Sequence, residues 1–248
     1  MASITAMRLP FAALSQWALD KLYPPLCPSC HVQVAAHGHL CGTCFQDLHM
    51  IAAPFCAQCG VPFAVDMGAE AMCPDCLDHP AGYLTARSAL VYGEVVGTLI
   101  KQLKYHDQMH GLNRFAQWMA QVAPESVDII IPVPLHWRRL LTRTYNQASW
   151  LAYGLSHEMG IVCMPQMLKR VRHTLPQARM SHAERQRNMK RAFIVPNRYK
   201  HDVEGKRILL VDDVMTTGST IEACADALKI AGAAEIHAVA LARAVRNI

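Results

Sequence analysis

Residues 207–220, with the sequence RILLVDDVMTTGST, constrain the fold of this chain more than any other segment. An apolar run typical of a buried strand ends in two carboxylates, Asp212 and Asp213, and a short turn then leads into a helix. The N-terminus of such a helix offers unpaired backbone N–H groups and the positive end of a dipole, which suit a phosphate group. An ordinary helix N-cap would account for one or two of these residues, but not for all of them in register. The segment therefore predicts a phosphate site formed by Thr216, Thr217, Gly218, Ser219 and Thr220.

The two acids at the end of this strand extend the prediction beyond a simple phosphate. Asp212 and Asp213 can accept hydrogen bonds from the vicinal hydroxyls of a ribose, or they can hold Mg²⁺ through water molecules. A Mg²⁺ ion held in this way would also bind the oxygens of a pyrophosphate. The strand, the turn and the helix together predict a site for a phosphorylated sugar.

Strand-like and helix-like patterns alternate after residue 80. Continuous apolar or β-branched runs predict strands at 86–92, 127–133, 206–211 and 236–241. Apolar residues at helical spacing predict helices at 94–105, 112–122, 145–158 and 220–231. Alternating strands and helices imply βαβ units, so we expect an α/β domain over residues 81–248, with a parallel sheet flanked by helices.

Eight of the ten cysteines form four Cys-x-x-Cys pairs between residues 27 and 76. Both sulfurs of such a pair reach one tetrahedral ion, so two pairs complete a structural Zn²⁺ site with no open position. Disulfides and redox-active Cys-x-x-Cys sites are the competing interpretations. Four evenly spaced pairs argue against redox catalysis, and the lack of a signal-peptide pattern argues against disulfides. Pairing in sequence order gives a double zinc ribbon over residues 23–80, and cross-bracing of the first pair with the third is the alternative. The predicted ligands of the two zinc ions are Cys27, Cys30, Cys41, Cys44, Cys56, Cys59, Cys73 and Cys76.

The two remaining cysteines are expected to be structural, and the N-terminal segment bears on the location of the protein. Cys163 and Cys224 lie in apolar contexts and are predicted to be buried core residues. Residues 1–22 have the apolar spacing of a short amphipathic helix, without the long apolar core or cleavage site of a signal peptide. The apolar stretches are interrupted before the ~18 residues that a membrane span needs. We therefore expect a cytoplasmic protein with no transmembrane segment.

Basic residues are concentrated between positions 169 and 191. This segment holds eight Lys or Arg residues and a single acid, Glu184. For the segment as a whole, this density of positive charge favours binding of a polyanion, either pyrophosphate or the backbone of a nucleic acid. For any single arginine of the segment, a solvated basic surface is the better explanation.

Three segments and the cysteine module together resemble the ComF family over nearly the whole chain. Residues 208–220 resemble the signature of type I phosphoribosyltransferases for 5-phosphoribosyl-1-pyrophosphate (PRPP). Residues 131–147 are similar to the pyrophosphate loop of ComF proteins, and residues 174–188 are similar to their mobile loop. One departure is Thr144, where the family usually has glycine, and this puts the local backbone geometry in question.

The resemblance implies a type I phosphoribosyltransferase-like domain that follows a small zinc-ribbon module. Asp212 and Asp213 would contact the ribose hydroxyls, 216–220 would hold the 5-phosphate, and Mg²⁺ would accompany PRPP. Arg185 would supply a cation to the leaving pyrophosphate. Arg185 and Asp213, which contacts the ribose, are the implied catalytic residues. The residues implied for the pyrophosphate and mobile loops are Val133, Pro134, Arg143, Asn146, Gln147, Gln177, Arg185 and Asn188.

Two functions are compatible with this resemblance. ComF family members are associated with natural competence, which implies that the chain binds PRPP and handles internalised single-stranded DNA. Its partners would then include single-stranded DNA and other competence proteins, such as a DNA helicase or translocase. The alternative is a true phosphoribosyltransferase that moves phosphoribosyl from PRPP to a nitrogenous base or another acceptor with release of pyrophosphate. No set of residues in the sequence specifies that acceptor, and a fold with a ligand site does not establish turnover.

Overall fold

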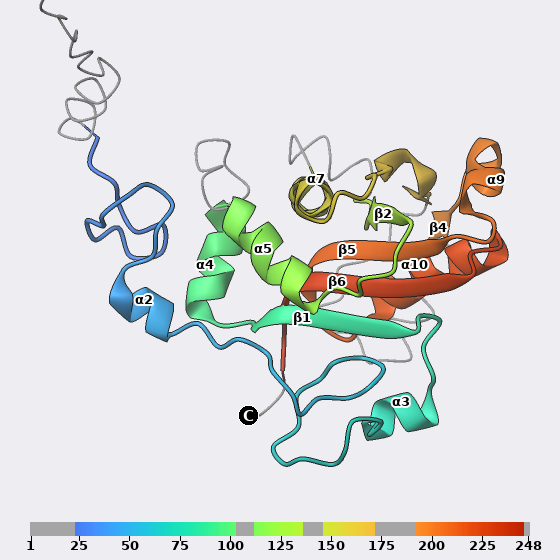
Figure 1. The fold of residues 1–248 in the computed structure, drawn as a ribbon, viewed down its shortest axis with the longest axis horizontal. Helices are drawn as coiled ribbons and strands as arrows, with labels where there is room; N and C mark the ends of the chain where they lie inside the picture. The colour runs from blue at the N-terminus through green and yellow to red at the C-terminus, as the bar shows by residue number, and fades with distance from the viewer. Residues whose placement is uncertain (1–22, 103–111, 136–145, 172–191, 246–248) are drawn as a thin grey trace, which may run out of the picture.

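A computed structural model describes residues 23–102, 112–135, 146–171 and 192–245. Its centre is a sheet in which every neighbouring pair of strands is parallel (Figure 1). The strands lie in the order β1 (Thr85–Val91), β6 (Glu235–Arg243), β5 (Arg207–Met215) and β2 (Ile129–Pro132). This arrangement confirms the α/β class predicted from the alternating pattern.

Helices cover both faces of the sheet because its central strands are apolar on both sides. In β5, Leu209 and Val211 belong to one core cluster, whereas Ile208 and Leu210 belong to the other. The first cluster also contains side chains of α4 (Glu94–Gln102), α5 (Leu112–Val122) and α7 (Gln147–Met159). The second cluster contains side chains of α10 (Ser219–Ile230). Among the helices in the described ranges, none combines the length and the apolar character needed to cross a bilayer.

A second, two-stranded sheet stands beside the main one. Its strands, β3 (Lys169–Arg170) and β4 (Phe193–Ile194), pair antiparallel, with Lys169 opposite Ile194. The buried side chains of Leu168 and Phe193 join it to the core on the α10 side. Three short helical turns flank the pair of strands: η2 (Pro165–Met167), η4 (Asn197–Tyr199) and α9 (Lys200–Val203).

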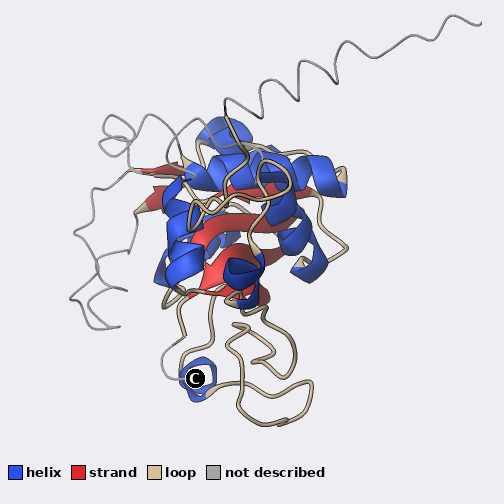
Figure 2. Cartoon of the chain, turned by 90° about the vertical axis from the view of Figure 1, so that its left-hand side faces the viewer, coloured by secondary structure: helices blue, strands red, loops and turns tan. Residues whose placement is uncertain are grey.

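The cysteine module lies against the outer edge of β1. It contains two short helices, α2 (Gly42–Gln46) and α3 (Pro74–Asp78), and is otherwise built of turns and loops (Figures 1 and 2). The backbone N–H of Val91 donates to the carbonyl of His49 at 2.8 Å, and that of Ala86 donates to the carbonyl of Gln58 at 2.7 Å. The module thereby pairs with an edge strand that would otherwise present free backbone groups.

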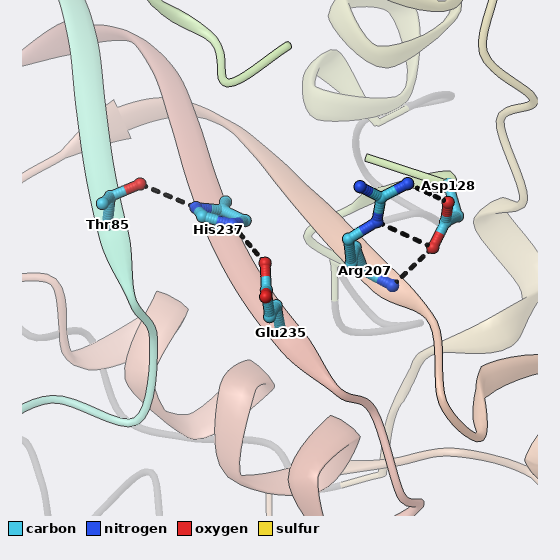
Figure 3. A network of polar contacts seen from close by, with 5 residues as sticks. All are labelled: Thr85, Asp128, Arg207, Glu235 and His237. Carbon is cyan, nitrogen blue, oxygen red and sulfur yellow. Dashed lines mark hydrogen bonds and ion pairs between the residues drawn. The ribbon is translucent and has the colours of Figure 1, made fainter. Parts of the chain in front are cut away.

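Polar side chains connect the strands at the amino-terminal end of the sheet (Figure 3). Arg207 Nη2 donates to Asp128 Oδ1 at 2.7 Å, and the Arg207 backbone N–H donates to Asp128 Oδ2 at 2.9 Å. These bonds lower the pKa of Asp128 to about 2. On the other side, His237 lies between Thr85 Oγ1, at 2.8 Å from Nδ1, and Glu235 Oε2, at 3.4 Å from Nε2. These contacts join the start of β2 to β5 and the start of β1 to β6, at the end of the sheet opposite the carboxyl ends of the strands.

Most of the predicted elements are present with shifted bounds. The helix at 112–122 has the predicted limits, and the other helices and strands begin or end a few residues away from theirs. The largest difference is β5, predicted at 206–211, which continues to Met215 and so contains both aspartates. The predicted N-terminal helix at 1–22 and the end of the predicted helix at 94–105 lie outside the described residues. Cys224 is fully buried as predicted, whereas Cys163 is only half-buried.

Candidate functional site

The carboxyl ends of β2 and β5 bring two of the predicted site segments together. Pro132 is in register with Val211, and the N–H of Val133 donates to the carbonyl of Val211 at 2.8 Å. Val133 and Pro134 therefore lie beside the start of the acidic pair, at the edge where ligands of open α/β sheets bind. The two segments are 78 residues apart in the chain, and the parallel register of the sheet makes them neighbours.

The predicted phosphate loop is the turn between β5 and α10. Gly218 has φ of 78°, a left-handed conformation that favours glycine, and it occupies the N-cap position of α10. A Cβ at this position would lie 2.8 Å from Met215 Cε and 3.3 Å from the Tyr83 hydroxyl. In the same turn the Thr217 hydroxyl donates to that of Ser219 at 3.2 Å. Gly218, as the N-cap residue, supplies no side-chain cap to α10, and a helix N-terminus of this kind is suited to a phosphate.

The two aspartates differ in their surroundings. Asp212 Oδ1 accepts from the N–H of Asp213 at 2.9 Å, and Asp213 Oδ1 accepts from the N–H of Val214 at 2.8 Å. Burial raises the pKa of Asp212 well above its usual value, and the neighbouring charge of Asp213 raises it further. Hydroxyl donors or a divalent cation would favour the ionised form of Asp212. The arrangement can therefore hold a sugar by its hydroxyls while the adjacent loop holds its phosphate.

Arg170 is a part of this site that sequence reasoning did not single out. Its guanidinium acts on Asp212 as a nearby positive charge that partly counteracts the rise in pKa. The same group lies 5.5 Å from the centroid of the Phe193 ring on the neighbouring strand β4. In the sequence Arg170 is one basic residue among eight, and no local pattern indicates that β3 lies near the end of β5. Only the tertiary fold distinguishes it from the others.

The start of α7 is tied to the end of β2. The side chain of Asn146 caps α7 by accepting from the N–H of Ala148 at 3.2 Å, and its Nδ2 donates to the carbonyl of Val133 at 3.0 Å. Gln147 is buried in the first turn of the helix. These contacts hold the two ends of the predicted pyrophosphate loop together. Arg143 of that loop, and Gln177, Arg185 and Asn188 of the predicted mobile loop, lie outside the described residues.

The eight paired cysteines form two clusters in sequence order. The first contains the pairs at 27/30 and 41/44, and the second contains those at 56/59 and 73/76, with the sulfurs of each cluster within 4.8 Å of one another. The Sγ–Sγ distances are 3.5 Å for Cys30–Cys41 and 3.7 Å for Cys59–Cys73. Zn–S bonds of about 2.3 Å in a tetrahedron place sulfurs about 3.8 Å apart, so both clusters fit a structural Zn²⁺.

Within the second cluster, Cys56 is the thiol that loses its proton more readily than an ordinary cysteine. Burial on its own would raise the pKa of Cys56, but backbone N–H donors, those of Cys73 and Cys59 first, lower it to about 7. These N–H groups lie 3.3 and 3.5 Å from Cys56 Sγ. All ten cysteines are free thiols, so the disulfide interpretation is not supported.

Comparison with known proteins gives the same two-part division. The double zinc ribbon domain matches residues 18–77, and the phosphoribosyl transferase domain matches residues 146–246. The chain is 32% identical over 229 residues to DNA utilization protein YhgH of Salmonella typhimurium, covering 89% of this chain and 97% of that protein. It is 31% identical over 222 residues to competence protein F of Haemophilus influenzae, covering 86% and 94%. The chain belongs to the ComF family.

The sheet of this ComF chain is phosphoribosyltransferase-like. Among solved structures, it is similar to the glutamine PRPP amidotransferase of B. subtilis, with a TM-score of 0.38 and 21% identity over 56% of this chain and 30% of that one. The two family matches and the two cysteine clusters, rather than this structural similarity, show that the ComF chain combines a phosphoribosyltransferase-like domain with an N-terminal module that has two zinc-type sites.

Proposed function

We propose that this ComF protein binds PRPP with Mg²⁺ at the carboxyl ends of β2 and β5 and acts in handling internalised single-stranded DNA during natural competence. The observation that carries the proposal is the junction of β5 and α10. There the acidic pair of Asp212 and Asp213 is followed by Gly218 and by the N-terminus of a helix of 12 residues. The pair supplies acceptors for ribose hydroxyls, and the helix supplies donors for the 5-phosphate.

The proposal assigns the remaining parts of PRPP to residues around this junction. Thr216–Thr220 would surround the 5-phosphate, and Mg²⁺ would bridge the acids and the pyrophosphate. The segments 136–145 and 172–191, which carry Arg143 and Arg185, start or end beside the site, at Asn146 and at β3. Arg185, with Gln177 and Asn188, would approach the pyrophosphate from the second of these segments.

The DNA-handling part of the proposal is supported by the two relatives and by charge. One is named a DNA utilization protein and the other a competence protein. Eight basic residues between 169 and 191 offer positive charge to a nucleic-acid backbone, and the second of them, Arg170, is close enough to act on Asp212. A cytoplasmic location, where thiols stay reduced, suits the two cysteine clusters. The protein partner that we propose is a DNA helicase or translocase.

The first test is a titration of fluorescent single-stranded DNA with the zinc-loaded protein, followed by anisotropy with and without Mg²⁺–PRPP. We expect a dissociation constant on the order of micromolar that weakens with added salt and changes when PRPP is present. Lys169→Gln, in the basic segment, should weaken binding, whereas Lys229→Gln, an exposed lysine on α10, should not. Absence of DNA binding at low salt would contradict a direct role in DNA handling.

A parallel assay for pyrophosphate release separates this function from the enzymatic alternative. Candidate bases and other acceptors are offered together with Mg²⁺–PRPP. Turnover that depends on one acceptor would identify a true phosphoribosyltransferase. Binding of PRPP without turnover for any acceptor supports a ligand site that serves DNA handling.

A further inference from the structure

Arg243, at the end of β6, is a buried cation that lies between the second cysteine cluster and the phosphate loop. Its side chain is 7% exposed. Nη1 donates to the carbonyl of Cys59 at 2.7 Å and contacts Met215 Sδ at 3.2 Å. Nη2 donates to Cys59 Sγ at 3.5 Å. One guanidinium thus contacts a zinc ligand on one side and the last residue of β5 on the other.

The backbone explains why Arg243 lies on this side of the sheet. Residues of β6 alternate between the two core clusters as far as Leu241, but Leu241 and Ala242 both pack into the cluster of α4, α5 and α7. Because the alternation shifts by one residue, the side chain of Arg243 is on the face that carries Met215. The register fixes the pair further, since the N–H of Ala244 donates to the carbonyl of Met215 at 2.9 Å.

Met215 in turn supports the phosphate loop. It is 2% exposed and directly precedes the turn at 216–218, and its Cε lies 2.8 Å from where a Cβ on Gly218 would be. The thioether therefore fills the space that the missing side chain of Gly218 leaves open. A substitution or movement of Met215 would change the surface on which the loop rests.

A second connection reaches the same loop from the same zinc ribbon. Gln58, located between two ligands of the second cluster, donates from Nε2 to the carbonyl of Tyr83 at 3.1 Å. The Tyr83 hydroxyl lies 3.3 Å from the same Cβ position on Gly218. The two side chains next to Gly218 are thus both connected to the second ribbon, Met215 through Arg243 and Tyr83 through its backbone carbonyl and Gln58.

Charge gives the contact with Cys59 its strength. Four thiolates around one Zn²⁺ carry a net charge of −2, and a buried guanidinium beside them is a favourable counter-charge. Loss of the metal would leave Cys59 freer to move, and any movement of Cys59 would weaken both of its hydrogen bonds with Arg243. A buried arginine without these acceptors must move, and Met215 is in contact with it.

We propose that Arg243 is a positioning residue that couples the second zinc site to the phosphate loop, so that a metal ion at Cys56, Cys59, Cys73 and Cys76 sets the affinity of the loop for the phosphate of PRPP. This inference rests on the proposed PRPP site. It assigns to the second zinc ribbon a role in ligand binding in addition to its own folding.

Arg87 provides a matched control because it is a second arginine beside the same cluster. It donates to the backbone carbonyls of Ala57 at 2.9 Å, Ala86 at 2.8 Å and Gln58 at 3.3 Å, and it lies 4.7 Å from the centroid of the Phe55 ring. The side-chain amide of Gln58, which contacts Tyr83, is not among its partners. These partners belong to the ribbon and to β1, not to the phosphate loop. Arg87→Gln therefore removes a neighbouring charge of the zinc site without touching Met215.

The test compares the affinity of Arg243→Gln, Arg243→Lys and Arg87→Gln for Mg²⁺–PRPP by calorimetry, with zinc content measured for each protein. We expect Arg243→Gln to weaken binding roughly tenfold at full zinc content, as is typical when a partner of a metal ligand is removed. Arg243→Lys should recover part of the affinity, and Arg87→Gln should bind as the unchanged protein does. Equal affinity of Arg243→Gln and Arg87→Gln would overturn the coupling.

A spectroscopic measurement on the unchanged sequence covers the case in which Arg243→Gln does not fold. Protein loaded with Cd²⁺ gives one NMR signal for each cysteine cluster, and Cys30→Ser assigns the signal of the first. Addition of Mg²⁺–PRPP should shift only the signal of the second cluster, and Met215→Leu, which keeps the volume but removes the sulfur, should reduce that shift.

If calorimetry shows binding and neither signal moves, the coupling is wrong while the proposed function stands. If PRPP does not bind the unchanged protein, the proposed function itself fails.

Discussion

At the scale of single residues, two glycines with nearly the same backbone conformation have different surroundings, and only one of them belongs to the candidate site. Gly218 and Gly160 both have φ near 70–80°, with values of 78° and 69°. A Cβ on Gly160 would meet nothing within 4 Å, whereas a Cβ on Gly218 would meet Met215 and Tyr83. The two glycines share the same backbone requirement, and only Gly218 adds a steric one.

Alanine substitutions at these two glycines separate backbone strain from the steric requirement. Gly160→Ala should cost about 1 kcal/mol of unfolding free energy, because a left-handed residue with a Cβ is strained, and should leave PRPP binding unchanged. Gly218→Ala should cost a similar strain and also displace Met215 or the loop, so that PRPP affinity falls by about tenfold or more. Thermal unfolding and calorimetry on both variants measure the two effects. Unchanged affinity in Gly218→Ala would show that the loop does not need its close approach to Met215.

The residues that sequence reasoning found and missed differ in how far their partners lie along the chain. Asp212, Asp213 and Gly218 were predicted because their chemistry is written in one continuous segment. Arg243 was missed because its acceptor Cys59 is 184 residues away, and a single arginine near the C-terminal end carries no pattern. Arg185 and the other predicted residues of the 172–191 segment stay predictions.

At the scale of elements, the strands are held at both ends by different interactions. Their carboxyl ends carry the site, and their amino-terminal ends carry the contacts between Asp128 and Arg207 and between Thr85, His237 and Glu235. The sequence predicted the existence of these strands well, since buried β-branched runs have few alternatives. It predicted the end of β5 too early, because two adjacent aspartates are rarely found within a strand. Their own side chains accept the backbone N–H groups at that point and allow the strand to continue to Met215.

The contact between β2 and β5 predicts a specific dependence of stability on pH. The pKa of Asp128 is lowered from 3.8 to about 2 by hydrogen bonds from Arg207, so the folded state binds this proton less readily than the unfolded state. The stabilisation is therefore complete above pH 3.8 and is lost as the pH falls towards about 2. Asp128→Asn should lower the melting temperature near neutral pH, and the difference from the unchanged protein should disappear in acid. A difference that stays constant with pH would mean that the carboxylate charge does not contribute.

At the scale of the whole molecule, the cysteine module and the sheet form one connected structure. The module contacts α4 through a hydrogen bond from Gln102 to the carbonyl of Pro28, and it pairs with β1 along the sheet edge. Sequence composition indicated two separate parts with a division near residue 80. It could not indicate their contacts, because these join backbone groups whose partners are set by tertiary structure.

Removal of zinc should therefore change the sheet edge as well as the module. Treatment with a strong chelator should raise the rate of amide hydrogen exchange at Ala86 and Val91 by more than about tenfold, because their N–H groups are bonded to the module. Amides of Leu209 and Val239, inside the sheet, should stay protected. Hydrogen exchange followed by mass spectrometry or NMR measures both sets. Equal protection of β1 with and without metal would show that the ribbons do not hold the edge.

The position of β1 between the ribbon and β6 also has a consequence for folding while the chain is being synthesised. Its neighbour within the sheet is β6, the last strand, so about 140 residues must leave the ribosome between the two. The zinc ribbon that borders β1 on its other side is synthesised before it, and metal binding lets such a small unit fold early. A nascent β1 would thus find its first partner in residues 49–58, already in place. The ribbon would cover one edge of this apolar strand during synthesis, and it stays on that edge when β6 pairs with the other one.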